Sequence, residues 1–162
     1  MISVQRLTQR KKDEQGFTVI ELLIVIVVLV ILIALVVATY GGIQQKNRDL
    51  TRQKNLETIH EQIEKYFLVG HYPSRADMNN PKWLAKNLPG LNPNILVDPS
   101  NPTHSEILIA KPSAKSYAYE PTQIDGVSSC ESNDTTCAKY ILTATYEGNV
   151  NGSNFLVIKS TN

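Results

Sequence analysis

One uninterrupted apolar run constrains this chain more than any other feature of its sequence. Every residue from Leu22 to Ala38 is Leu, Ile, Val or Ala, without glycine, proline or charge. Counted from Phe17, the segment reaches the ~20 residues that a helix needs to cross a bilayer. A helix satisfies its backbone hydrogen bonds internally, as lipid requires, whereas a strand this long and apolar on both faces would aggregate. The run therefore predicts one membrane-spanning helix near the N-terminus.

A single carboxylate, that of Glu21, lies at the start of this run. A charged side chain inside a bilayer costs ~2.5–3.5 kcal/mol on insertion scales, so Glu21 needs either a partner or a purpose. Glu21 is therefore a candidate functional residue rather than part of a plain anchor.

The charges that precede the run predict its orientation. A basic segment just before a spanning helix favours a cytoplasmic N-terminus and export of the rest of the chain. The net charge of the whole chain is only +1, so we find no basic field typical of a nucleic-acid-binding protein. The basic residues of the leader are Arg6, Arg10, Lys11 and Lys12, opposed by Asp13 and Glu14.

The leader ends at Gly16, which is followed by Phe17 and, four residues further, by Glu21. A basic leader, a glycine, an aromatic residue, this glutamate and an unbroken apolar helix together resemble the class III signal of type IV prepilins. The resemblance implies that a prepilin peptidase cuts between Gly16 and Phe17 and methylates the new N-terminus. It also implies that Glu21 meets the terminal amine of a neighbouring subunit and sets the axial register during assembly.

The pattern changes after Tyr40, where Gly41 and Gly42 lower the helix propensity. Beyond them, apolar residues recur at spacings of three and four up to Gly70, which indicates an amphipathic half-helix that packs on the chain's own sheet. We therefore expect four parts: a cleaved basic leader (1–16), a transmembrane and assembly helix (17–40), an amphipathic half of the helix (41–70) and a globular head (71–162).

The head is expected to contain a small sheet. Its C-terminal half has short segments that are apolar or that alternate between apolar and polar residues, as strands do. A long helix followed by a loop region and then strands predicts an α+β domain, in which an antiparallel sheet of three or four strands packs on the helix. The expected strands are 106–110, 116–120, 139–147 and 154–159.

Cys130 and Cys137 both lie in the part that we expect to be exported. In an oxidising compartment such a close pair favours a disulfide, and two cysteines without nearby histidines are too few for structural zinc. We therefore predict a Cys130–Cys137 disulfide that closes a short polar loop and contributes ~2 kcal/mol.

We predict no catalytic, metal or cofactor site. The three histidines are scattered and form no Ser/His/Asp or Cys/His grouping. The oxygen-bearing residues near the cysteines suggest calcium, but no EF-hand pattern is present and a solvated polar turn is the better interpretation. The histidines are His60, His71 and His104, and the oxygen-bearing residues are Asp125, Glu131, Asn133 and Asp134.

We interpret the chain as the structural subunit of a type IV pilus-like surface filament, not an enzyme, with a role in motility, adhesion or DNA uptake. A fibre needs a heterologous interface between copies that does not close into a ring. The resemblance implies further partners, namely the prepilin peptidase, an assembly ATPase and a membrane platform protein. It also implies a single-pass location in the cytoplasmic membrane, with the head outside, followed by a location in the extracellular pilus.

Two alternatives stay open. The first is a major pseudopilin of a type II secretion or competence system. The second is a signal-anchored extracytoplasmic binding protein that never polymerises, for which an intact N-terminus or a start at Thr39 would be expected.

Overall fold

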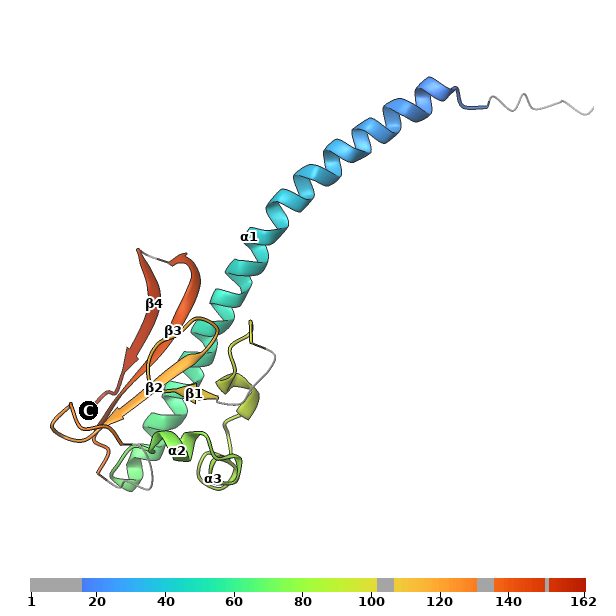
Figure 1. The fold of residues 1–162 in the computed structure, drawn as a ribbon. Coiled ribbons are helices and arrows are strands. Elements are labelled where there is room, and N and C mark those ends of the chain that lie inside the picture. The colour runs from blue at the N-terminus through green and yellow to red at the C-terminus, as the bar shows by residue number, and fades with distance from the viewer. Residues whose placement is uncertain (1–15, 102–106, 131–135, 151) are drawn as a thin grey trace, which may run out of the picture. The chain divides into compact units, whose positions relative to one another are not determined.

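A computed structural model describes residues 16–101, 107–130, 136–150 and 152–162 (Figure 1). The chain divides into two compact units, of which one ends at Tyr40 and the other spans Gly41–Asn162. One helix, α1 (Val19–Tyr66), contributes to both units, and Gly41 and Gly42 lie within it. Most of the expected leader lies outside the described residues.

The first unit is the apolar part of α1. Its large apolar side chains are exposed along the whole segment, from 91% at Phe17 to 49% at Val27. By length and composition α1 is apolar enough to cross a membrane. The predicted apolar helix is therefore present, and its described large apolar side chains are about half exposed or more.

The second unit contains the amphipathic half of α1. Leu56, Ile59 and Ile63 are fully buried, which confirms the expected apolar stripe. A 3₁₀ turn, η1 (Phe67–Val69), follows, and Gly70 ends it in a left-handed conformation with φ of 98°. The Gly70 N–H donates to the Phe67 carbonyl at 2.8 Å, so this glycine caps the helix as predicted.

The sheet of the second unit has four strands in the order β1-β2-β3-β4. The prediction of an α+β fold, with a long helix on a small sheet, is confirmed. The sheet is mixed rather than antiparallel, because β1 pairs with β2 in parallel while the other two pairs are antiparallel. The strands are β1 (Leu108–Ile109), β2 (Tyr117–Thr122), β3 (Lys139–Val150) and β4 (Ser153–Lys159).

A contact with the loop region also holds β1. The side chain of Asn79 donates to the Leu108 carbonyl at 2.8 Å and accepts from the Leu108 N–H at 2.9 Å. This pair of hydrogen bonds holds β1 from the side opposite β2. Alternation of apolar residues carries no information on strand direction, and the antiparallel expectation was wrong for β1.

Three short helical segments fill the loop region between α1 and the sheet. They are α2 (Arg75–Met78), α3 (Pro81–Asn87) and η2 (Pro93–Leu96). Each begins at a polar cap, namely Ser74, Asn80 and Asn92, whose side chains accept backbone N–H groups of the first turn.

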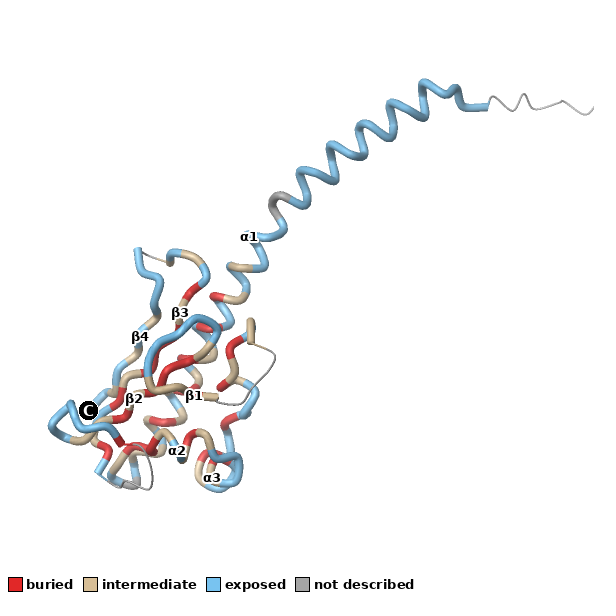
Figure 2. The backbone as a smooth tube through the Cα atoms, in the orientation of Figure 1, coloured by how far each residue is buried: buried red, intermediate tan, exposed pale blue. Residues whose placement is uncertain are grey.

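The core of the head lies between α1, the sheet and these short helices (Figure 2). Three tyrosines lie together in it, one from the segment after η1, one from β2 and one from β3. Tyr72 stacks edge-on against Tyr140 with ring centroids 4.8 Å apart, and Tyr119 lies 5.5 Å from Tyr140. The Tyr119 hydroxyl donates to the Pro73 carbonyl at 2.8 Å, so this buried phenol has a hydrogen-bond acceptor. The core therefore closes the segment after α1 onto the sheet.

Candidate processing and assembly site

The residues that the sequence analysis singled out lie together at the start of α1. Gly16 and Phe17 are exposed and precede the helix, which begins at Val19. The peptide bond between them is therefore in non-helical chain, and a β-carbon added at Gly16 would meet nothing within 4 Å. A bond in this environment is sterically accessible to a peptidase.

Glu21 forms a capping box with Thr18. The Thr18 N–H and the Thr18 hydroxyl both donate to Glu21 Oε2 at 2.8 Å. In return, the Glu21 N–H donates to the Thr18 hydroxyl at 3.3 Å. Reciprocal bonds of this kind satisfy donors that the first helical turn leaves without partners. In the uncut chain Glu21 therefore has local hydrogen-bond donors.

Thr18 is a residue that the sequence analysis missed. Its signal was visible, because a threonine followed three residues later by a glutamate before an apolar run is the capping-box pattern.

Both cysteines are fully buried in the core of the head. The Cys137 carbonyl accepts from the Tyr72 N–H at 2.9 Å, and the Cys130 carbonyl accepts from the Arg75 N–H at 3.2 Å. Burial raises the pKa of Tyr119, and Tyr140 and both cysteines add to that rise, so the two cysteines lie near one phenol. The Cys130–Cys137 disulfide stays a prediction, and most of the loop between the two residues lies outside the described part.

The histidines take different positions. His60 Nδ1 lies 2.6 Å from the Tyr140 hydroxyl, and that hydroxyl donates to Glu64 Oε1 at 2.9 Å. His71 Nδ1 lies 3.0 Å from the carbonyl of the following residue. Of the residues that suggested calcium, Asp125 binds its own loop. The others, Glu131, Asn133 and Asp134, lie outside the described residues, as does His104.

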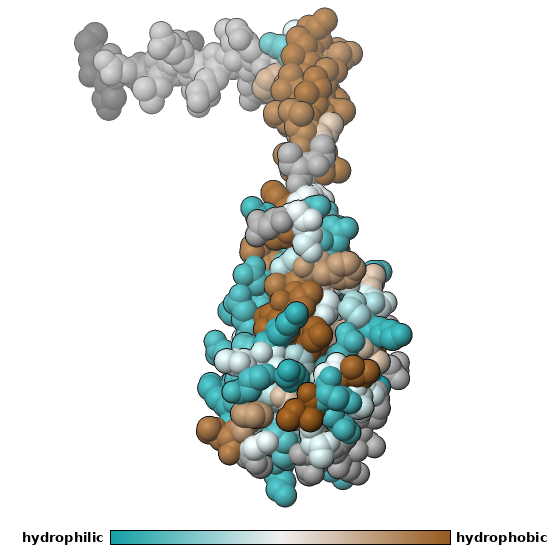
Figure 3. All heavy atoms as spheres, turned by 90° about the vertical axis from the view of Figure 1, so that its left-hand side faces the viewer, coloured by the Kyte–Doolittle hydropathy of each residue, from teal (hydrophilic) through white to brown (hydrophobic). Residues whose placement is uncertain are grey.

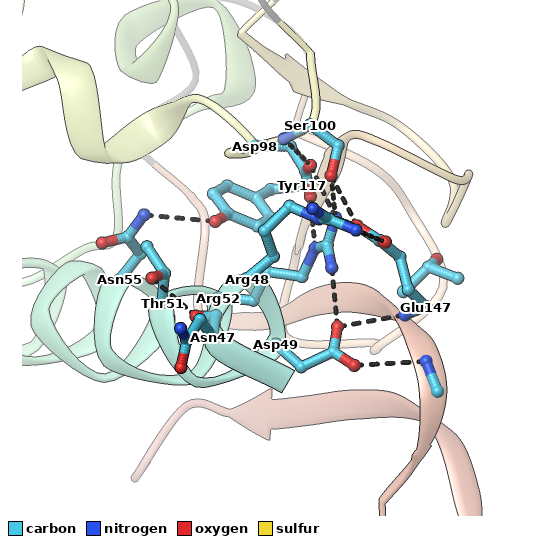
Figure 4. A network of polar contacts seen from close by, with 12 residues as sticks. Asn47, Arg48, Asp49, Thr51, Arg52, Asn55, Asp98, Ser100, Tyr117 and Glu147 are labelled. Carbon is cyan, nitrogen blue, oxygen red and sulfur yellow. Dashed lines mark hydrogen bonds and ion pairs between the residues drawn. The ribbon is translucent and has the colours of Figure 1, made fainter. Parts of the chain in front are cut away.

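One buried arginine side chain, that of Arg52, forms ion pairs and hydrogen bonds with several parts of the head (Figure 4). Arg52 of α1 is fully buried and donates from Nε and Nη2 to the two carboxylate oxygens of Asp98, at 2.7 and 2.9 Å. Its Nη1 donates to Asp49 at 2.6 Å. Its Nη2 also donates to Ser100 at 2.7 Å and to Glu147 of β3 at 2.8 Å. Burial lowers the pKa of Arg52, but the hydrogen bonds to the three carboxylates outweigh it and raise that pKa.

This network joins three segments that are far apart in the sequence. Asp49 also accepts the backbone N–H groups of Glu147 at 3.0 Å and Gly148 at 3.1 Å, which ties the end of β3 to α1. Arg48 adds a hydrogen bond to Glu147 at 2.7 Å. The sequence analysis missed Arg52. Its signal was position, because Arg52 lies one helical turn before Leu56 and therefore on the apolar stripe of α1.

Because of this network, the free energy of unfolding of the head is expected to fall at low pH. Hydrogen bonds from Arg48 first, and then from Ser100 and Arg52, hold the pKa of Glu147 well below its ordinary value, although burial opposes them. A carboxylate whose pKa is lower in the folded state stabilises the fold above the unfolded pKa, which is ~4.3 for glutamate. That contribution is lost as the pH falls from there through the folded pKa.

We therefore expect the urea midpoint of the detergent-solubilised chain to fall between about pH 5 and about pH 3. The variant Glu147→Gln should be less stable than the wild type at pH 7 and should lose less stability over this acid range. Unfolding curves at a series of pH values test this expectation. If the urea midpoints of the two proteins fell equally with decreasing pH, Glu147 would not contribute to the acid dependence of stability.

The comparisons with known proteins concern the N-terminal part of the chain. Residues 11–37 match the family model described as the prokaryotic N-terminal methylation motif. The matched range contains Gly16, Phe17, Thr18 and Glu21, and it ends within the apolar segment. No curated protein and no solved structure matched the chain. The match confirms the resemblance that the sequence indicated for the start of the chain.

Proposed function

Because residues 11–37 carry this methylation motif, the class III signal of type IV pilins and pseudopilins, we propose that the chain is the structural subunit of a type IV pilus-like filament. A prepilin peptidase cuts it after Gly16 and methylates Phe17. The processed chain then polymerises through its N-terminal helix. The role is structural rather than enzymatic.

One observation carries the proposal, namely the exposure of the whole apolar segment behind the methylation motif. The large apolar side chains from Phe17 to Val37 are at least about half exposed. Burial of apolar surface contributes about 25 cal/mol per Å², so this surface requires cover from outside the subunit. Lipid covers it before assembly, and the same segment of other copies covers it in the fibre.

The geometry at Thr18 supports a role for Glu21 in assembly. Its carboxylate lies at the exposed start of the helix, within one helical turn of the position where cleavage creates a new amine on Phe17. Copies packed along a common axis place the amine of one subunit against the Glu21 of another. A buried pair of opposite charges of this kind sets register rather than adding much net stability.

The proposed parts of the chain follow from this mechanism. The leader (1–16) stays in the cytoplasm and is removed, and residues 17–40 cross the cytoplasmic membrane. The second half of the helix (41–70) belongs with the globular part (71–162) to the head outside, which afterwards becomes part of the surface of an extracellular filament. An assembly ATPase and a membrane platform protein extract each subunit from the bilayer.

A pseudopilin of a type II secretion or competence system would share the cleavage, the anchor and the assembly mechanism. Asp98-Pro99 resembles a dipeptide that precedes the sheet in major pseudopilins, and here Asp98 is the bidentate partner of Arg52. Electron microscopy of the material sheared from cells separates the two roles, because a pilus subunit yields long filaments.

Mass spectrometry of the mature N-terminus tests the proposed function. The expected result is a chain that begins with N-methylated Phe17. The variant Gly16→Leu should keep the leader, whereas the matched variant Gly41→Ala should be processed normally, since a β-carbon at either glycine meets nothing within 4 Å. An intact N-terminus, or a start at Thr39, in the wild-type chain would overturn the proposal.

A further inference from the structure

A short loop after β2 presents apolar side chains to solvent. We call residues 123–129 the knob. Its two large apolar side chains, Ile124 and Val127, are each 84% exposed. Figure 3 shows that apolar groups also lie among hydrophilic ones on the face that carries β4. Branched aliphatic side chains as exposed as these contribute favourable free energy only when another surface removes them from water.

The knob is held by its own hydrogen bonds. Asp125 Oδ1 accepts from the N–H groups of Val127 and Ser128, both at 2.9 Å. The Gln123 N–H donates to the Ser128 carbonyl at 2.8 Å. The hydrogen bond from the Ser128 hydroxyl, followed by those two N–H groups, lowers the pKa of Asp125, which is an anion at neutral pH. A loop ordered in advance loses little conformational freedom when it binds.

A groove of about 400 Å³ lies at the other end of the sheet, between α1 and the end of β3. Such a volume falls within the ~300–1,000 Å³ typical of ligand pockets, which is ample for two branched side chains. Leu50, which is 54% exposed, lines it together with Tyr146 and Val150. Lys46 is exposed and also lines the groove. The groove therefore presents both apolar side chains and one positive charge. We call this the α1–β3 groove.

The knob and the α1–β3 groove lie at opposite ends of β3. Thr122 pairs with Ser129 of the knob and with Lys139, the first residue of β3, while Val150 is the last residue of β3 and lines the groove. At ~3.3 Å per residue, the strand between Lys139 and the groove residues Tyr146 and Val150 spans roughly 23–36 Å. In Figure 1 the loop after β2 and the end of β3 lie at opposite ends of the sheet. A head therefore cannot insert its knob into its own groove.

We propose that the knob of one copy docks in the α1–β3 groove of the next copy in the filament. Ile124 and Val127 cover Leu50 and Val150 of the neighbour, and Asp125 lies against Lys46. Such an interface joins two different surfaces, which is the kind of contact that an open helical fibre requires. The inference rests on the proposed function, because polymerisation through the N-terminal helices brings the heads together.

Cysteine cross-linking in assembled filaments tests the docking. Filaments are sheared from cells that assemble the full chain with Leu50→Cys and Val127→Cys, oxidised, and analysed without reductant. The expected result is a ladder of covalent multimers, with at least a tenfold excess over either single variant. The matched control combines Val127→Cys with Leu68→Cys, since Leu68 is 93% exposed but lies outside the groove. Filaments without a ladder, or an equal ladder in the control, overturn the docking and leave the proposed function intact.

A milder pair of variants covers the case in which the cysteine chain fails to assemble. Asp125→Asn keeps the oxygen that accepts the two N–H groups, while Lys46→Gln removes the opposite charge. Each should raise, several-fold, the fraction of filaments that salt and shear dissociate, and the double variant should be no worse than either single variant. Additive effects, or none, would show that the two side chains do not meet. Wild-type cells without any filaments would overturn the proposed function itself, and the docking with it.

Discussion

Replacing Arg52 with methionine is expected to lower the free energy of unfolding of the head by ~3–5 kcal/mol, the usual cost of removing one partner of a buried ion pair. Asp49 and Asp98 are both buried, and they would keep their charges without the guanidinium that lies between them. The loss is a large part of the ~5–15 kcal/mol by which a domain is typically stable. Arg52→Lys should restore little, because a lysine ammonium cannot bind Asp98 with two parallel hydrogen bonds.

Trp83 provides the measurement. It is the single tryptophan of the chain, and its ring lies 5.1 Å from that of Tyr66, inside the head. Urea unfolding of the full chain in detergent, followed by tryptophan fluorescence, therefore reports on the head. The matched control is Arg48→Met, which removes a partly exposed partner of Glu147 and should cost much less than the loss of Arg52. Equal losses for Arg48→Met and Arg52→Met would contradict the role assigned to the buried network.

Replacing Glu21 with glutamine is expected to abolish filament assembly while processing at Gly16 continues. Glutamine also serves in capping boxes, so the start of α1 keeps its cap and only the charge is lost. In the apolar interior of a fibre, an amine without its carboxylate costs ~3–5 kcal/mol. We therefore expect the yield of sheared filaments to fall by more than about tenfold, which corresponds to ~1.4 kcal/mol.

The complementary variant separates charge from helix capping. Thr18→Ala removes the cap but keeps the carboxylate, at a cost of ~0.5–2 kcal/mol to the first turn of the helix. It should assemble better than Glu21→Gln. The N-terminus of both variants is sequenced, and filaments are counted by electron microscopy. Wild-type filament yield from a normally processed Glu21→Gln chain would show that the charge sets no register.

The features that the sequence predicted correctly depend on neighbours along the chain. The apolar run indicates a helix long and apolar enough to span a membrane, because hydrophobicity over ~20 residues is a local property. Spacings of three and four between Leu56, Ile59 and Ile63 indicate one buried face of a helix, whatever covers that face. Gly70 ends the helical segment because its left-handed conformation suits a residue without a side chain.

The contacts that the sequence did not reveal join residues far apart. Arg52 and Asp98 are 46 positions apart, and Arg52 and Glu147 are 95 apart. Periodicity indicates that Arg52 lies on the buried face of α1, but it does not indicate which of the chain's carboxylates pairs with its guanidinium. The contact that holds β1 from the loop region likewise comes from Asn79, which lies 29 positions before Leu108.

The amino-acid order alone thus predicts the signal at Gly16 and Phe17, the apolar helix that begins beside Glu21, and an α+β head. Each of these features depends on residues that are adjacent or regularly spaced along the chain. Packing in three dimensions decides the rest. It selects Asp98 and Glu147 as the partners of Arg52, and it places the knob and the α1–β3 groove at opposite ends of one sheet. The physical reason is that charge pairing and surface shape depend on distances in space, which a linear pattern does not contain.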